Sequence, residues 1–430
     1  MSKKYELTNE TINVEGYTLH RIKALRDFGN VKKGDLGGFI EFGINLSQDG
    51  LCWVYGDAKV LDNAKVYGDA KVLDNAEVFE DAIVFGDAEV YDDAKVYGDA
   101  KVFDNAKVYG NAKVYGDAKV NEDAKVFDNA EVCGDGEVFG DAEVYGNAEV
   151  CGYAKVFDNA KVYRNARVFK DARVYEHAKV FGNAKVYSNA NVYGYARVYE
   201  HAKVFDNAEV YSNANVYGYA RVYEHAKVYG NAKVFGDAKV FDNAEVFGDA
   251  EVYDDPEVFG DARVFGDARV CMNAKVFDNA KVFNNAEVRG YAKVFDNAEV
   301  HDNAKVFNNA EVHDNARVHG DARVHGDARV YRNAEVCGHA SIAMSGDITS
   351  PNDYIVVGPL GSRDGYTTVY RILNSEDVSN SANVRIQCGC FNGTSDEFFA
   401  RVDSAHKKGT IYHTQYTTIV KPIVDAMRNM

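Results

Sequence analysis

The sequence contains no uninterrupted run of 18 or more apolar residues, the length that a membrane-spanning helix requires. Its first residues, 1–5, include two lysines, but no apolar segment follows them, so we expect no secretory signal peptide. These absences predict a soluble, cytoplasmic protein that does not act at a membrane.

Proline is scarce, with four residues in 430, and tryptophan occurs once. What the chain has instead is a period. A small aliphatic residue returns every six positions from Val54 to Ile342 without an insertion or deletion, and it is valine at every place but the last. A fixed short period overrides the expectation of two or three globular domains for this length and predicts a solenoid.

Each repeat has one inward-facing and one outward-facing set of positions. The first hexapeptide, residues 54–59, reads VYGDAK. Its first and fifth places face inward, its second and sixth places face outward, and its third and fourth places form a turn. Three hexapeptides close a triangular coil of 18 residues, which is the signature of a left-handed parallel β-helix, an exception to the right-handed crossover rule. Forty-nine repeats predict about 16 coils and a rod of roughly 75–80 Å, at ~4.8 Å per strand.

Residues 1–52 precede the period and predict an N-terminal β cap. Two short apolar segments, 11–14 and 17–22, read as a β-hairpin with a two-residue turn, and a glycine-rich turn leads into a strand at 39–42. The first coil of a solenoid exposes its core and its strand edges, so a cap is the simplest role for this segment.

The period ends after Ile342, so the predicted domains are the cap, a β-helix over 53–345 and a C-terminal α+β module over 346–430. The module contains a capping-box sequence at Thr394 that opens a helix through about Lys407, and a second helix is expected around Pro422. Its predicted strands are 354–357, 367–372 and 384–388.

Seven cysteines, an odd number, are scattered along the chain and favour a reducing compartment over a disulfide framework. Cys133 and Cys151 are 18 residues apart, so stacked coils would bring them to bridging distance. We expect free thiols, with a bridge between these two residues as the alternative.

The formal net charge is −17, and acidic residues gather at the two turn places while basic residues gather at the sixth place. A nucleic-acid-binding groove would need an unopposed basic stripe, so this distribution disfavours a nucleic-acid partner. The turn carboxylates could bind calcium, but Asp and Asn also simply suit turns, which is the default interpretation.

The second place of the repeat is mostly aromatic, and residues 18 apart should stack. Stacked rings can stabilise flat sheets, or they can form an adhesive surface for a protein partner. The predicted binding ladder on one face consists of Tyr91, Tyr109, Phe127, Tyr145 and Tyr163.

A duplication indicates what the faces are for. Residues 175–199 recur as 199–223 with two changes. The offset of 24 residues is not a multiple of 18, so every copied side chain moves to a different face. A ligand site built on one face would not survive that shift, which favours a generic rod.

One column of residues offers metal-ligand chemistry. His301, His319 and Cys337 are spaced by 18 and would present two nitrogens and a sulfur at ~4.8 Å intervals. Ligands of one zinc ion must converge, however, whereas strand stacking holds side chains parallel. Substitution into ordinary outward positions is the simpler account of these histidines.

The C-terminal module contains Cys388, Cys390 and His406. Cysteine and histidine are the residues of nucleophilic catalysis or of a metal site. A single C-x-C at the end of a predicted strand is a weak signal by itself, so these residues are catalytic candidates only.

Residues 25–40 together with 45–54 resemble the N-terminal stretch of the YdcK-like bacterial hexapeptide-repeat proteins. Members of that family are classed as acetyltransferases by similarity, so the resemblance implies a left-handed β-helix and an acyl-CoA-dependent activity. Hexapeptide acyltransferases typically use a histidine on or near a loop extruded from the coil, with acyl-CoA lying between protomers, and this period leaves no room for such a loop. The C-terminal module is similar to modules of phage and prophage repeat proteins.

Three functions follow from these patterns. The first is a non-enzymatic rod, without a cofactor, that presents a C-terminal interaction module to a protein partner. The second is a hexapeptide acyltransferase, and the third is an acidic decoy that binds a host protein through its turn carboxylates. The sequence is also compatible with a homo-oligomer.

Overall fold

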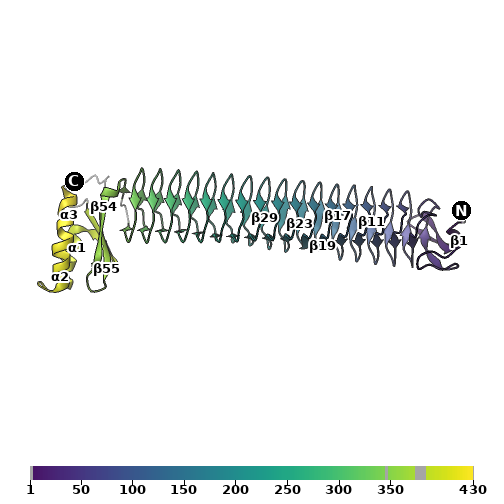
Figure 1. Ribbon diagram of the computed structural model, residues 1–430, viewed down its shortest axis with the longest axis horizontal. Coiled ribbons are helices and arrows are strands. Elements are labelled where there is room, and N and C mark those ends of the chain that lie inside the picture. Colours follow the sequence, from purple (N-terminus) through teal and green to yellow (C-terminus); the bar gives the residue numbers. More distant parts are fainter. Residues whose placement is uncertain (1–2, 344–346, 373–383, 430) are drawn as a thin grey trace. The chain divides into compact units, whose positions relative to one another are not determined.

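The structure is a computed structural model that describes residues 3–343, 347–372 and 384–429. The chain divides into two compact units, Met1–Glu224 and His225–Met430, which are described separately. Both units are built from a parallel-strand β-solenoid (Figure 1), so the predicted fold class is confirmed. No helix in these ranges is both long and apolar enough to span a bilayer.

The coils keep the six-residue period of the sequence. In the first unit strand starts recur from β4 (Trp53–Val54) to β32 (Arg221–Val222), and in the second from β33 (Lys227–Val228) to β53 (Asp347–Ile348). Each strand is two to four residues long and joins the sixth place of one repeat to the first place of the next. Parallel pairing sets each residue beside the one 18 positions later, as Glu89 lies beside Lys107.

The interior of the coils is filled by valine and alanine. Side chains of both types at the first and fifth places have essentially no exposed surface. Backbone hydrogen bonds join consecutive coils, as where the N–H of Lys95 donates to the carbonyl of Ala112 at 2.9 Å. The interior is narrow enough for valine and alanine to fill it, and backbone hydrogen bonds between coils satisfy peptide groups along it.

The turns explain the acidic residues at the third place. The third residue of the repeat has a positive φ, as at Gly86 (+68°), where a Cβ would lie 2.8 Å from the nitrogen of Asp104. Acidic residues also occupy this place, and their carboxylates accept backbone N–H groups one coil further on. Asp62 accepts from Glu80 at 3.2 Å and Asp92 accepts from Gly110 at 3.1 Å. Many turn carboxylates therefore satisfy backbone donors within the fold.

The N-terminal cap begins with the predicted hairpin, formed by β1 (Tyr5–Val14) and β2 (Tyr17–Ala24). The strand predicted at 39–42 starts earlier, as β3 (Leu36–Ile40), and pairs in parallel with β5 (Lys59–Val60). The glycine-rich segment before it was interpreted as a turn. Gly34 does lie in a turn, whereas residues 36–38 belong to the strand. A Cβ at Gly37 would lie 2.5 Å from the carbonyl oxygen of Val54, so only glycine allows this approach.

Tyr5 is the first residue of β1 in the cap and is 2% exposed. Its hydroxyl lies 2.7 Å from the carbonyl of Leu46 and 2.9 Å from that of Gly43. Burial, followed by the nearby Cys52, raises the pKa of Tyr5 to about 12. The neutral phenol is therefore the form that the folded cap accommodates.

We expect the cap to lose stability as the pH rises from about 10 to 12. The unfolded chain releases the Tyr5 proton near pH 10, while the folded chain retains it to about pH 12, so the contribution of Tyr5 is complete below pH 10 and then falls. The loss corresponds to about 2–3 kcal/mol. Tyr5→Phe should cost about 1 kcal/mol at neutral pH and flatten the alkaline decline. Urea unfolding across this pH range measures both effects, with the exposed Tyr153→Phe as the control; equal slopes for the two variants would contradict the assignment.

Cys133 and Cys151 form a disulfide between neighbouring coils of the first unit, with their Cα atoms 4.6 Å apart. The expectation of free thiols is therefore wrong for this pair, because parallel register holds the two cysteines side by side. The bridge occupies two successive places of an aromatic column, which continues below and above it at Tyr115 and Phe169. The remaining five cysteines are free.

Reduction of this disulfide should destabilise the first unit by about 3 kcal/mol, because the bridge closes an 18-residue loop in the unfolded chain. Urea unfolding with and without a phosphine reductant measures the loss. The double variant C133S/C151S should match the reduced protein. In C133F/C151F the ring column is continuous, so part of the loss should be recovered without a cross-link. A wild-type protein that is insensitive to reductant would contradict the prediction.

The C-terminal module is an antiparallel four-stranded sheet with helices packed against it. The three predicted strands are confirmed, and a fourth follows a tight turn that the sequence analysis did not recognise. In sheet order the strands are β54 (Tyr354–Leu360), β55 (Gly365–Arg371), β56 (Val384–Cys388) and β57 (Phe391–Thr394).

The first predicted helix of the module is confirmed as α1, with its capping box formed between Thr394 and Glu397. The helix around Pro422 is also confirmed as α3 (Lys421–Arg428), but helical structure begins 10 residues earlier, at α2 (Ile411–Gln415). A π-helical segment ends at Val420, two residues before Pro422, whose missing N–H cannot continue regular α-helical bonding. The helices are η1 (Pro351–Asp353), α1 (Ser395–Ala405), α2 (Ile411–Gln415), η2 (Tyr416–Val420) and α3 (Lys421–Arg428).

Within the second unit the module's sheet covers the end of the last coil. The buried hydroxyl of Tyr370 donates to the carbonyl of Ala343 at 2.6 Å, and Thr368 accepts the backbone N–H of Ser341 at 2.8 Å. The module therefore also acts as the C-terminal cap of the solenoid.

Candidate functional site: a pocket in the C-terminal module

The predicted aromatic ladder is present in the first unit. Neighbouring rings lie in stacks with centroids 4.7–4.9 Å apart and planes within 5° of parallel. Each of the five rings is partly buried rather than fully exposed. The faces of the rings are therefore covered by the neighbouring rings of the ladder. A binding role for the ladder remains a prediction. The stacked residues are Tyr91, Tyr109, Phe127, Tyr145 and Tyr163.

Charged side chains at the outward-facing strand positions also form ion pairs with residues of the same column. Glu89 lies between Lys71 and Lys107, at 2.8 and 3.0 Å, and the hydrogen bond from Lys71 lowers the pKa of the Glu89 carboxyl. Amide side chains at the fourth place form a similar ladder, as where Asn111 donates to Asn129 at 3.2 Å. Much of the outer surface of the coils is therefore engaged in contacts within the solenoid.

A groove of about 850 Å³ runs along one edge of the first unit. Its walls are a column of turn carboxylates, including Asp99 and Asp117, and a column of strand lysines, including Lys101 and Lys119. Carboxylates and ammonium groups in equal proximity do not select a ligand of one charge. The groove is thus a surface feature that the repeat generates along the coils, rather than a specialised binding site.

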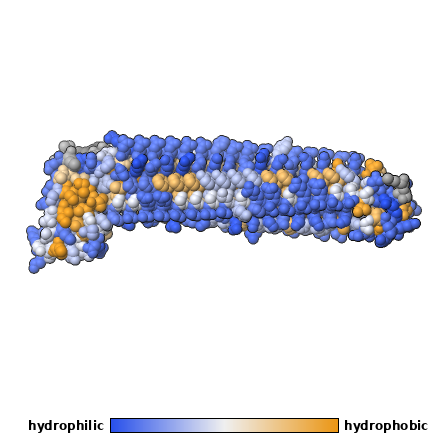
Figure 2. Space-filling view, viewed as in Figure 1, coloured by the Kyte–Doolittle hydropathy of each residue, from blue (hydrophilic) through white to orange (hydrophobic). Residues whose placement is uncertain are grey.

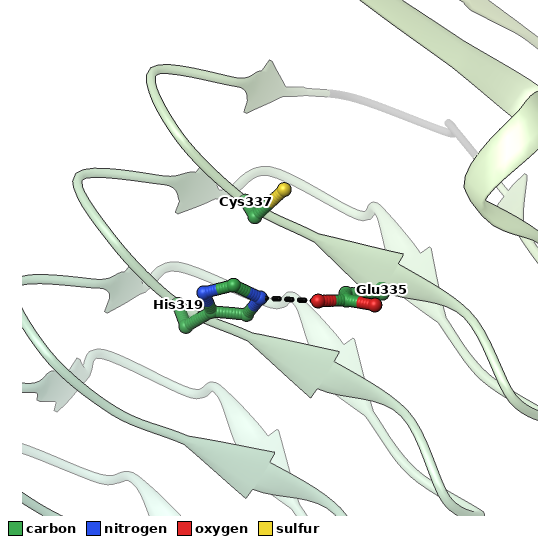
Figure 3. A group of neighbouring side chains, drawn as sticks. All are labelled: His319, Glu335 and Cys337. Atoms are coloured by element: carbon green, nitrogen blue, oxygen red, sulfur yellow. Dashed lines mark hydrogen bonds and ion pairs between the residues drawn. The ribbon is translucent and has the colours of Figure 1, made fainter.

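The three predicted metal-site residues do not form one cluster. The ring of His301 stacks on that of His319, with centroids 4.9 Å apart, and its Nδ1 lies 3.2 Å from Asp302. His319 Nε2 instead lies 2.6 Å from a carboxylate oxygen of Glu335, which the sequence analysis did not consider. Figure 3 shows Cys337 beside this pair.

The three catalytic candidates line one pocket. Cys388, Cys390 and His406 surround a cavity of about 280 Å³ in the C-terminal module. Cys390 is exposed, whereas Cys388 and His406 are partly buried. The cavity is enclosed by the β54–β55 connection, the β56–β57 turn, α1 and the start of η2. Figure 2 shows apolar surface gathered over this module.

Apolar rings form the wall of the pocket. Phe398 packs edge-on against Tyr416, with centroids 5.4 Å apart, and Phe391 lies 5.3 Å from Phe398. Gly361 is required here, because its φ is +75° and a Cβ would overlap the hydroxyl of Tyr416. The wall belongs to the buried core of the module, so the pocket is a fixed feature of its packing.

Cys388 contacts hydroxyl groups rather than a general base. Its sulfur accepts a hydrogen bond from Thr367 at 3.2 Å and lies 3.7 Å from the hydroxyl of Tyr416. Burial, followed by the neighbouring Cys388, raises the pKa of Tyr416, so this phenol keeps its proton. The ring of His406 stacks on Tyr416 at 6.0 Å. Among the described residues no hydrogen bond joins His406 to Cys388, which is the contact that an activated cysteine nucleophile requires.

Two arginines at the rim of the pocket were missed by the sequence analysis. Arg363 and Arg401 line the cavity, and both are exposed. Arg401 lies over the ring of Phe391 at 5.8 Å, but neither guanidinium makes an ion pair with any residue that the structure describes. No local sequence signal links these residues, because only the packing of α1 on the sheet brings both to one cavity.

No protein-family model matches this chain, and a search of curated protein sequences finds no match either. The stacked parallel coils are consistent with a β-helix repeat protein. The more specific resemblance over residues 25–40 and 45–54 remains an interpretation of the sequence.

Proposed function

We propose that this chain is a non-enzymatic interaction protein whose solenoid is a spacer and whose C-terminal pocket binds a partner protein. The observation that carries the proposal is the contrast between the two surfaces. The outer faces of the coils are largely occupied by their own ring stacks, ion pairs and amide ladders. The pocket instead offers aromatic walls beside two arginines that have no ion-pair partner among the described residues.

The chemistry of the pocket favours an acidic segment of the partner. An apolar side chain would enter the cavity beside Phe391 and Phe398, and flanking carboxylates would reach Arg363 and Arg401. Arginine presents a planar pair of donors that matches a carboxylate, and aromatic walls are typical of residues that anchor an interface. This combination supports a short acidic peptide rather than a nucleic acid as the ligand.

The spacer role rests on the uniformity of the coils. The duplication of residues 175–199 as 199–223 moves every side chain to a different face, which a coil-borne binding site would not tolerate. The turn carboxylates that an acidic decoy would need are partly committed to backbone N–H groups. The acyltransferase alternative has only the sequence resemblance behind it.

Binding of acidic peptides to the full chain tests the proposal. An array of peptides with one Phe or Leu flanked by Asp and Glu should contain ligands, and the same peptides with Lys flanks should not bind. The variant R363E/R401E should weaken binding by about tenfold or more, equivalent to about 1.4 kcal/mol. The matched control K407E/K408E makes the same charge change at exposed positions of the same module that do not line the pocket.

Deletion of residues 97–114 removes one coil and tests the spacer. Because 18 residues are lost, every column keeps its register, and peptide affinity should stay within about twofold of the full chain. Equal binding by R363E/R401E and the wild type would contradict the pocket assignment. Loss of binding on removal of the coil would contradict the spacer assignment.

A further inference from the structure

His319, Glu335 and Cys337 gather on one outer face near the end of the second unit's coils (Figure 3). Their ligand atoms, Nε2 or Nδ1, a carboxylate oxygen and Sγ, all lie within 4.8 Å of one another. His319 follows β48 (Arg317–Val318), while Glu335 opens β51 (Glu335–Val336) and Cys337 follows it. These two strands pair in parallel, which sets His319 beside Cys337 and diagonal to Glu335.

The diagonal contact is a recurring feature of these coils. Elsewhere a tyrosine hydroxyl lies 3.3 Å from a glutamate 16 residues later, as between Tyr115 and Glu131 and between Tyr193 and Glu209. At His319 the same backbone frame carries an imidazole nitrogen in place of the phenol. The neighbouring aromatic place is taken by Cys337. The diagonal contact therefore brings three metal-ligating groups together without any loop. A simple column of residues spaced by 18 would only stack them in parallel.

Contacts around the three residues hold them in place. The ring of His319 stacks on His301 with planes 2° from parallel, so its Nε2 is directed at Glu335, 2.6 Å away. The backbone N–H of Cys337 donates to the hydroxyl of Tyr354 at 2.9 Å. That hydroxyl lies 3.6 Å from the cysteine sulfur, so its own hydrogen is available to the sulfur. Such outer contacts orient the ligands of protein metal sites.

We propose that His319, Glu335 and Cys337 form a zinc-binding site. Imidazole, carboxylate and thiolate are the three ligand types that zinc takes in proteins, and three protein ligands leave a fourth position for water. The Glu335 side chain is 48% exposed and that of His319 is 25% exposed, so the ion reaches the site from solvent and a water completes its coordination. The ion takes the place of the hydrogen between His319 and Glu335, which leaves Nε2 for Nδ1 or for solvent, and the Cys337 thiol releases its proton to water as it binds.

The bound ion joins two consecutive coils of the second unit. One ligand comes from the coil that contains β48 and two come from the coil that contains β51. Tyr354, which contacts the cysteine ligand, is the first residue of β54 in the capping module. Zinc therefore stabilises the region where the solenoid meets its C-terminal cap.

Cobalt titration of the full chain tests the site, because a cysteine ligand gives Co²⁺ a thiolate charge-transfer band in the near ultraviolet. The background variant C388S/C390S removes the free thiols of the pocket. In this background Co²⁺ should produce the band and Zn²⁺ should abolish it by displacement. Cys337→Ser should eliminate the band, and Glu335→Gln should weaken binding by about tenfold or more. Absence of the band, or its persistence after Cys337→Ser, would overturn the proposal.

One substitution in the site and two matched controls distinguish this site from the neighbouring histidines. His319→Phe restores the aromatic residue typical of this place and keeps the ring stack, but it lacks the nitrogen ligand, so Zn²⁺ should no longer raise the melting temperature. His301→Phe and His313→Phe keep the stack at other positions and should bind Zn²⁺ as the wild type does. Unchanged zinc affinity in His319→Phe, or equal loss in His301→Phe, would show that the ligand set is wrong.

Discussion

Replacement of Trp53 by alanine is expected to destabilise the first unit by about 3–5 kcal/mol. The side chain lies in the first strand of the coils, is 1% exposed and is the largest fully buried side chain among the described residues. Its ring packs edge-on against Phe28 and Tyr5, with centroids 5.3 and 6.1 Å apart. The cavity cannot collapse easily, because Trp53 belongs to β4, whose backbone is held by the ladder to β7 (Lys71–Val72).

Urea unfolding followed by far-ultraviolet circular dichroism measures this loss, since Trp53 is the sole tryptophan and its fluorescence disappears with the substitution. Tyr153→Ala is the matched control. Tyr153 is also aromatic but 62% exposed, so its truncation should change stability by less than about 0.5 kcal/mol. Similar losses in the two variants would show that the cap contributes little to the stability of the coils beneath it.

Asp353→Ala should destabilise the second unit by about 3–5 kcal/mol, because it leaves a partly buried arginine without its charge partner. The Asp353 side chain is 4% exposed. One carboxylate oxygen accepts from Arg371 at 3.0 Å, and the other accepts from the backbone N–H groups of Thr349 and Ser350 and from the Thr349 hydroxyl, at 2.8–3.0 Å. These donors connect the end of the last coil to strand β55.

Amide hydrogen exchange in β54 and β55, together with urea unfolding, should report the loss. Asp353→Asn keeps the shape of the side chain and should recover part of the stability. The control is Asp396→Ala, which removes an ion pair to Arg428 at a carboxylate that is 64% exposed and should cost less than about 1 kcal/mol. An Asp353→Ala variant as stable as Asp396→Ala would contradict the view that this network attaches the module to the coil.

The proposed spacer and the proposed zinc site both depend on the stacking of residues 18 positions apart. A uniform repeat places identical residues side by side, so it produces ladders that pair with themselves. A local departure from the repeat, such as His319 with Cys337, places different groups in the same frame. Specific chemistry in this fold is therefore expected where the repeat is substituted and at its ends.

The prediction of sites from the sequence succeeded where neighbours in space are separated by exactly one coil. The stack of Tyr91 on Tyr109 and the closeness of Cys133 to Cys151 both follow from an offset of 18 residues. The oxidation state of Cys133 and Cys151 was wrongly predicted, because residue spacing says nothing of whether two adjacent thiols bond. Glu335 was missed because its contact with His319 is diagonal, with an offset of 16.

The sequence alone determined the solenoid, its inward valine and alanine residues and the columns of its outer faces. It could do so because each coil repeats the one before, which converts a distance along the chain directly into a position in space. Only the tertiary structure brought Cys388, His406, Arg363 and Arg401 around one pocket. Their proximity depends on how α1 and η2 pack against a twisted antiparallel sheet, and no period in the sequence encodes that packing.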